Sequence, residues 1–297
     1  MSLDSAESGT VLANLELSRS LTIQWLVVGT MGFGIAIAAF SGLFRAVTGQ
    51  AVTYSFATGV DWWIQPLNVL VILALSVVVI FPHEWLHGLA IGHYGGEPRY
   101  GVGVAHFVLP YAYATTDYRF TRNQFLVVCL TPLVVLTLVG VPAMMLFGWG
   151  GLALPLAANA GGAVGDLWMA LVLVGYPSHV TVEDYKTGFR ILGREGDDPR
   201  ELRATAAVWD ALVGAALATV GLLVFLTVGG LFLLDALGVE SFTLGDPDTI
   251  TFVFAYSNTP TEISVGVGPG VPVLGAALGL ANAFVRAYRR SARASAG

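Results

Sequence analysis

Charged residues are scarce in this chain, and their scarcity decides its class. Of its 297 residues only 11% are charged and 55% are hydrophobic, whereas soluble domains carry about 25% charged residues. The mean hydropathy is +0.73. This composition excludes an ordinary soluble domain and predicts a protein that crosses a membrane several times.

Cysteine is nearly absent, because Cys129 is the only one in the sequence. No disulfide can form within the chain, and zinc sites built from several thiolates are excluded. Any metal site must therefore use histidine and carboxylate ligands.

Basic residues are also few, with Lys186 as the only lysine and a net charge of −6. This balance is unlike that of nucleic-acid-binding proteins, so no nucleic-acid partner is expected. Residues 1–17 contain no basic residue at all. Because a signal peptide begins with a basic region, none is expected here.

Six apolar runs are long enough to cross a membrane as helices, since about 20 residues span the hydrocarbon core. The predicted spans are 21–43, 64–92, 125–147, 152–176, 207–234 and 268–286. The expected fold class is therefore an all-α polytopic membrane protein of about six helices. Of the 14 basic residues, all but Arg45 fall on one side of these spans. That distribution predicts a multi-pass protein of the cell membrane with both termini in the cytoplasm.

The connection at residues 94–123 is not simply polar. Its segments 100–105 and 109–115 combine β-branched and aromatic residues with glycine, a composition typical of strands. The sequence leaves two interpretations open, a small β-hairpin on the cytoplasmic side or an irregular amphipathic loop.

A polar turn at residues 193–200 is a candidate domain boundary. We expect residues 1–205 to form a four-span core and residues 206–297 to form a two-span extension.

His83 and His87 lie four residues apart inside the second apolar run, with Glu84 between them. On a helix, positions i and i+4 share one face, so both imidazoles can bind one ion. The pattern H-E-x-x-H is typical of zinc hydrolases in which the glutamate is the general base for zinc-bound water. The alternative is a pair of core histidines beside a buried ion-pair partner. Polar side chains inside an apolar span are costly and usually functional, so we expect Zn²⁺ bound by the histidines and Glu84 as the catalytic base.

A catalytic zinc site needs a third protein ligand and an open position for water. The candidates are His93, Glu97, His106, Asp166, His179, Glu183 and Asp184. With a helical rise of about 1.5 Å per residue, the two histidines lie about 8–14 Å below the cytoplasmic boundary, and Asp166 lies about 15 Å below it. No other candidate lies inside a predicted span at that depth, so Asp166 is the expected ligand. The alternative is a structural pair between Asp166 and another donor.

Asn159 precedes Asp166 by two helical turns, on about the same face of the fourth predicted span. The glycines between them allow close backbone approach. We expect Asn159 to bind the substrate backbone or to orient water. A hydrogen bond between helices is the alternative.

The arrangement of these residues resembles the site-2 protease class of intramembrane metalloproteases. That class has the H-E-x-x-H pattern in one membrane helix and an Asn-then-Asp element in a later one. Within the class, residues 83–192 resemble the small zincin-peptidase membrane proteins. The similar runs are 110–115, 124–125, 131–133 and 165–166.

The resemblance implies His83, His87 and Asp166 as zinc ligands and Glu84 as the base. It covers about a third of the chain. Site-2 proteases carry Asn-x-x-Pro before the aspartate and glycine after it, whereas here glycines replace the proline and Gly165 precedes the aspartate. The last two predicted spans have no counterpart.

The expected function is a zinc-dependent intramembrane endopeptidase that acts in the lipid bilayer on membrane-embedded or membrane-proximal segments of a transmembrane protein substrate. One alternative is a membrane metallohydrolase that acts on a lipid or a small amide with the same site. A second is a transporter or metal-binding sensor, but the chain lacks the internal repeats and further intramembrane charges that transporters show. A third is an inactive descendant, although all the site positions are present.

Overall fold

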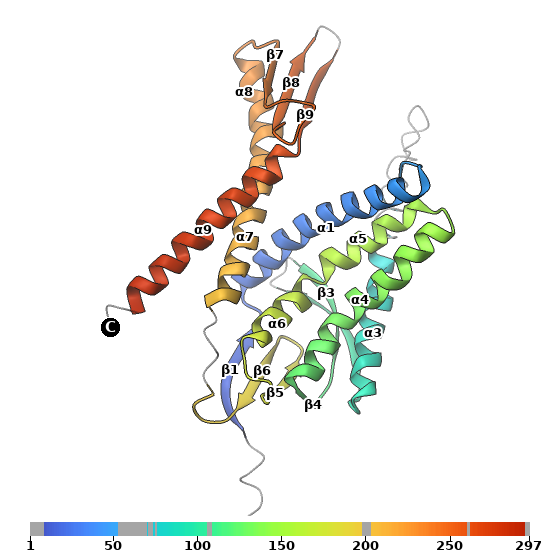
Figure 1. Cartoon of the computed structure of the whole chain (residues 1–297), viewed down its shortest axis with the longest axis vertical. Coiled ribbons are helices and arrows are strands. Elements are labelled where there is room, and N and C mark those ends of the chain that lie inside the picture. Colours follow the sequence, from blue (N-terminus) through green and yellow to red (C-terminus); the bar gives the residue numbers. More distant parts are fainter. Residues whose placement is uncertain are drawn as a thin grey trace, which may run out of the picture. The chain divides into compact units, whose positions relative to one another are not determined.

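The computed structural model describes residues 9–52, 70, 74, 76–105, 109–197, 203–259 and 262–294 (Figure 1). The chain divides into two compact units, Met1–Leu202 and Arg203–Gly297. Each unit is described by itself below.

The first unit contains both long and short helices. They are α1 (Arg19–Thr48), α3 (Ile80–His93), α4 (Arg122–Leu146), the short 3-10 helix η2 (Gly150–Leu152), α5 (Ala153–Gly162) and α6 (Val164–Val174). Ser18 caps α1 by accepting a hydrogen bond from the Leu21 N–H, and Thr121 forms a reciprocal capping box with Gln124 at the start of α4. These side chains satisfy N–H groups that a helix start leaves without partners.

Four helical segments in the described part of the chain are long and apolar enough to cross a membrane. They are Arg19–Thr48, Arg122–Leu146, Ala204–Ala236 and Gly270–Ala292. The predicted span 152–176 is broken, because residues 150–162 and 164–174 meet at a bend of 41°, and the two parts make a fifth candidate only if they are counted as one span. Much of the predicted span 64–92 lies outside the described residues, and its end is α3. These helices indicate a membrane protein.

The described part of the chain is mostly helical, as expected, but it is not purely all-α, because strands in it also form three sheets. In the first unit β1 (Thr10–Glu16), β6 (Gly188–Gly193), β5 (Thr181–Tyr185) and β4 (Arg119–Thr121) form an antiparallel sheet in that order. The sequence expectation missed it because these strands are short and β1 and β6 lie far apart in the chain. The charged residues in these segments are equally typical of an irregular loop.

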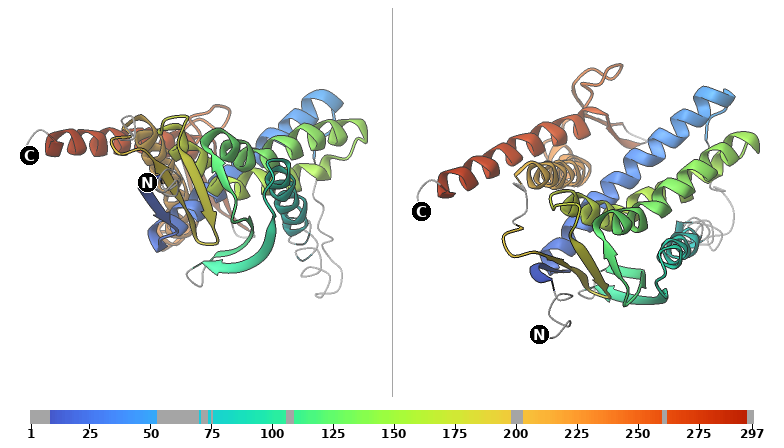
Figure 2. Two further views of the ribbon diagram at one scale, coloured as in Figure 1. Left: turned by 90° about the horizontal axis from the view of Figure 1, so that it is seen from below. Right: turned by 60° about the horizontal axis from the view of Figure 1, so that its bottom comes forward.

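Of the two interpretations left open for residues 94–123, the structure supports the β-hairpin, since β2 (Arg99–Ala105) pairs antiparallel with β3 (Leu109–Thr115). It runs beside α3 in both views of Figure 2. Gly101 faces Tyr113 and Gly103 faces Tyr111 across the strands. Each tyrosine ring covers its glycine so closely that a Cβ would clash with the ring, which explains the glycine pattern in β2.

A core of buried side chains joins the sheet to the helices of the first unit. Ile91 of α3, Phe125 of α4 and Leu173 of α6 belong to one cluster with Val182 and Ile191 of the sheet. Dense apolar packing of this kind holds elements in fixed positions. The helices that carry the candidate site are therefore anchored at their ends nearest the sheet.

The second unit contains two long helical segments and a small sheet. In this unit α7 (Arg203–Val224) continues through the π-helical η3 (Phe225–Gly230) into α8 (Leu231–Ala236), followed by β7 (Ser241–Leu244), β8 (Phe254–Asn258), β9 (Ile263–Val267) and α9 (Gly270–Ala294). At Gly279 of α9 a Cβ would collide with the α7 backbone, so glycine permits the close pairing. Near the ends of the same helices, the buried Asp210 carboxylate accepts hydrogen bonds from Arg286 at 2.9 Å and Arg290 at 2.5 Å.

Candidate metal centre

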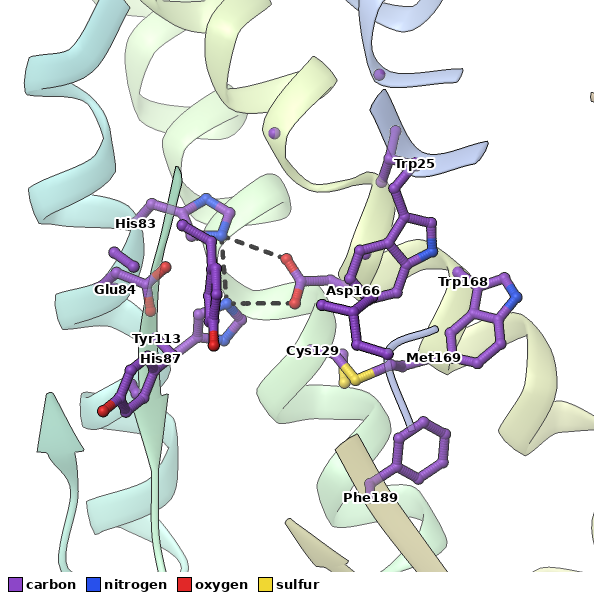
Figure 3. Close-up of a pocket in the computed structure, with 18 of the residues that line it drawn as sticks. Trp25, His83, Glu84, His87, Tyr113, Cys129, Asp166, Trp168, Met169 and Phe189 are labelled. Carbon is purple, nitrogen blue, oxygen red and sulfur yellow. Dashed lines mark hydrogen bonds and ion pairs between the residues drawn. The ribbon is translucent and has the colours of Figure 1, made fainter. Parts of the chain in front are cut away.

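Three potential ligands converge in the first unit. His83 and His87 extend from one face of α3 toward Asp166 in the first turn of α6 (Figure 3). The Nε2 atom of His83 lies 3.2 Å from Nε2 of His87 and 3.3 Å from Asp166 Oδ2. Nε2 of His87 lies 3.5 Å from Asp166 Oδ1. No other group of three such ligands occurs in the described part of the chain.

The spacing of these atoms suits a tetrahedral ion. Ligand atoms bonded to one zinc ion at about 2.0–2.1 Å lie about 3.3 Å from one another. The observed separations of 3.2, 3.3 and 3.5 Å come close to this value. Two imidazoles and one carboxylate are also a donor set that zinc uses in catalytic sites, so the residues present fit Zn²⁺.

The break between α5 and α6 puts Asp166 in place. Because α6 starts anew at Val164, Asp166 lies in a first turn, where free N–H groups favour a carboxylate. Two glycines hold the segment against α1. A Cβ on Gly161 would lie 2.8 Å from the Gly29 carbonyl oxygen, and a Cβ on Gly165 would lie 3.1 Å from the Trp25 ring.

The other ring nitrogen of each histidine has a partner of its own. His87 Nδ1 lies 2.9 Å from the backbone carbonyl oxygen of Val128 on α4. His83 Nδ1 lies 2.8 Å from Oδ1 of Asn159 on α5. Partners of this kind orient metal-binding imidazoles and are found around most zinc sites. Asn159 thus contacts the site directly, and its Nδ2 atom has no hydrogen-bond partner within the described structure.

Glu84 lies beside the histidines next to β3 and outside the group of three (Figure 3). Its carboxylate accepts a hydrogen bond from the backbone N–H of Ala114. Glu84 therefore faces the hairpin, where it can act on a molecule bound between β3 and the histidines.

A cavity of about 550 Å³ opens onto the three ligands and Glu84. Its size falls in the usual range for binding sites of small molecules, about 300–1,000 Å³. Apolar side chains from α1 and α6 form one wall, including Trp25, Phe33 and Trp168, and Tyr113 of β3 forms another. The cavity can therefore hold an apolar chain next to the polar site.

Asp184 of β5 also lines this cavity. Burial raises the pKa of its carboxyl to about 7, although a hydrogen bond with the Thr115 side chain opposes the shift. Sequence reasoning named Asp184 only as one candidate third ligand. The structure places it in the cavity wall, outside the ligand group.

The remaining ligand candidates lie elsewhere. His179 pairs with Asp197 at 2.6 Å, and Glu183 pairs with Arg119 and Arg190 in the sheet. His93 at the end of α3 and Glu97 beyond it are exposed, and His106 lies outside the described residues. Sequence reasoning missed the Val128 carbonyl and the aromatic cavity wall, because only the packing of distant segments brings them to the site.

Residues 76–181 match a protein family described as "Putative zincin peptidase". The matched segment contains all three potential ligands, Glu84 and Asn159. The match supports a zinc metallopeptidase family and zinc as its cofactor. The chain matches none of the curated proteins and none of the solved structures with which it was compared.

Proposed function

We propose that this protein is a zinc-dependent intramembrane endopeptidase of the site-2 protease type. It would hydrolyse peptide bonds in membrane-embedded or membrane-proximal segments of a transmembrane protein substrate. The observation that carries the proposal is the convergence of His83, His87 and Asp166, with Glu84 beside them, at an apolar cavity.

His83, His87 and Asp166 would hold the ion, and Glu84 would act as the base. The bound zinc would polarise the scissile carbonyl and lower the pKa of its water. Glu84 accepts a proton from the attacking water and then passes it to the leaving amine, so that one water molecule is consumed for each bond cleaved. Asn159 Nδ2, which lacks a partner in the described structure, is available to donate a hydrogen bond to a substrate carbonyl.

The hairpin offers a backbone edge for the substrate. Successive residues of a strand direct their backbone N–H and C=O groups to opposite edges. Because the Ala114 N–H bonds to Glu84, the backbone groups of Ala112 also face the edge away from β2. No strand in the described structure pairs with that edge. An extended peptide that pairs there would lie between β3 and α3.

A helical substrate must unwind before cleavage, because an α-helix keeps its carbonyls in its own hydrogen bonds. Pairing with β3 would stabilise the unwound form. We place the catalytic function in the first unit and assign none to the second. We also propose that the protein lies in the lipid bilayer of the cell membrane, with both termini in the cytoplasm.

The substrate class can be tested on purified, zinc-loaded protein in lipid nanodiscs. The proposal predicts cleavage of a single-span transmembrane peptide within its span or near the membrane boundary. In a matched control experiment, phospholipids and short acyl amides replace the peptide, and the proposal predicts that neither is hydrolysed. Hydrolysis of lipid or acyl amide without peptide cleavage would instead establish the alternative membrane metallohydrolase. Zinc binding without any hydrolysis would favour a metal sensor or transporter.

A further inference from the structure

We propose that Asn159 is a positioning residue that fixes the tautomer of His83. In this role its side-chain oxygen holds the ring proton on Nδ1, so that Nε2 keeps a free electron pair for the metal. The inference rests on the proposed function. It adds that a residue of α5 determines which ring nitrogen of a metal ligand on α3 is protonated.

The contact is short and shielded from water. His83 Nδ1 and Asn159 Oδ1 are 2.8 Å apart, and the two residues are only 8% and 2% exposed. An amide oxygen can only accept a hydrogen bond, so the imidazole nitrogen that faces it must be the donor. A neutral imidazole carries one such proton, which leaves Nε2 unprotonated.

His87 shows the same arrangement with a different acceptor. Its Nδ1 faces the Val128 backbone carbonyl at 2.9 Å, and its Nε2 lies 3.2 Å from Nε2 of His83. Two independent acceptors on two helices thus direct both Nε2 atoms to one point beside Asp166. The acceptor from Asn159 is a side-chain oxygen, whereas the acceptor from Val128 is a backbone oxygen. Only the Asn159 acceptor can therefore be removed by substitution.

The orientation of the Asn159 amide decides whether His83 is a competent ligand. In the observed orientation Oδ1 faces the ring, and Nδ2 has no partner in the described structure. If the amide were reversed, Nδ2 would donate to Nδ1 and the ring proton would have to lie on Nε2, where it would block the metal. The Asn159 backbone carbonyl accepts a hydrogen bond from the Ala163 N–H at 2.9 Å, which ties the residue to the end of α5.

A neutral amide also limits the negative charge of the site. The carboxyl groups of Glu16, Glu84, Asp166 and Asp184 already line this cavity. A further carboxylate beside His83 would add to their mutual repulsion at low dielectric, whereas the amide oxygen accepts the hydrogen bond from the imidazole without adding a charge. Aspartate at position 159 would nevertheless keep the acceptor, which makes it the conservative replacement for a test.

The first test is the zinc affinity of the purified full-length protein, measured by competition with a chelator. Asn159→Leu removes the acceptor, and we expect Kd to rise about 10–100-fold, the usual effect of losing such a partner. Asn159→Asp should restore binding to within about threefold of the wild type. Asn282→Leu is the matched control, because Asn282 bonds to the Asp210 carbonyl in the second unit, and its Kd should not change.

The second test observes the tautomer itself by ¹⁵N NMR of zinc-loaded protein labelled at its five histidines. We expect His83 to carry its proton on Nδ1 and bind zinc through Nε2. Binding through Nδ1 in the wild type would overturn the inference, even if Asn159→Leu does not fold. An Asn159→Leu protein with wild-type zinc affinity would overturn it as well. A wild-type protein that binds no zinc would instead overturn the proposed function on which the inference rests.

Discussion

At the scale of single residues, sequence spacing brings two ligands together and tertiary structure supplies the third. The i, i+4 spacing alone puts His83 and His87 on one face of α3. Asp166 reaches them only because the helix breaks before Val164 and the Gly161 backbone lies against α1. The spacing of the two histidines is visible in the sequence. The break between α5 and α6 is not, because no proline marks it.

The buried carboxyl of Asp184 should make the stability of the folded protein depend on pH. Burial raises its pKa from 3.8 to about 7, so the folded protein keeps a proton that the unfolded chain has released above about pH 4. Stability should therefore fall as pH rises from about 4 to about 7 and level off above that. Asp184→Asn removes this loss of stability. In thermal unfolding of the metal-free protein, the increase in Tm of Asp184→Asn over the wild type should be larger at pH 8 than at pH 5.

Asp248→Asn serves as the control, because that aspartate is exposed and lies in the other unit. Its effect should be the same at both pH values. An Asp184→Asn variant with equal shifts at pH 5 and pH 8 would show that the carboxyl does not titrate in this range.

At the scale of elements, close backbone contacts hold the site together. The α1 and α5 helices meet at Gly29 and Gly161, where a Cβ on either residue would lie 2.8 Å from the opposite carbonyl oxygen. Larger residues there would push α5 away from α1 and move the segment that leads to Asp166. The adjacent Gly162 has open space around it and provides a comparison at the next position.

We therefore predict that Gly161→Ala lowers the free energy of unfolding by about 1–3 kcal/mol, the usual cost of overpacking. Gly162→Ala should be neutral or stabilising by up to about 1 kcal/mol, since alanine favours a helix more than glycine does. Thermal unfolding in detergent measures both. Equal effects of the two substitutions would contradict the close contact between α1 and α5.

Sequence patterns predicted elements with strong local signals and missed those formed by distant pairing. The apolar runs identified α1 and α4, and the β-branched and aromatic residues indicated the β2–β3 hairpin as one of two open interpretations. The four-stranded sheet was missed because β1 pairs with β6, more than 170 positions later in the chain. The sheet of β7, β8 and β9, which lies between the last two predicted spans, was not among the predicted elements.

At the scale of the whole molecule, the distribution of basic residues predicts how the chain lies in the membrane. All but Arg45 of the 14 basic residues fall on one side of six spans, which predicts cytoplasmic termini. Residues 235–269 contain no basic residue and should lie on the opposite side.

Single cysteines at Ser241 and Ser291 test this topology. Both positions are exposed, and the native Cys129 is buried, so it should give little background. An impermeant thiol reagent should label position 241 but not 291 in intact cells, and both positions in permeabilised cells. Labelling of 291 alone in intact cells would mean that the orientation is reversed.

Zinc content and peptide cleavage of Glu84→Gln separate the role of the general base from that of the metal ligands. Glu84 lies outside the ligand group, and the substitution keeps its shape while removing the proton acceptor. We predict zinc content close to the wild type and a loss of cleavage of at least about 10²-fold, whereas His87→Ala should lose both zinc and cleavage. A Glu84→Gln protein that cleaves at a near wild-type rate would contradict the account.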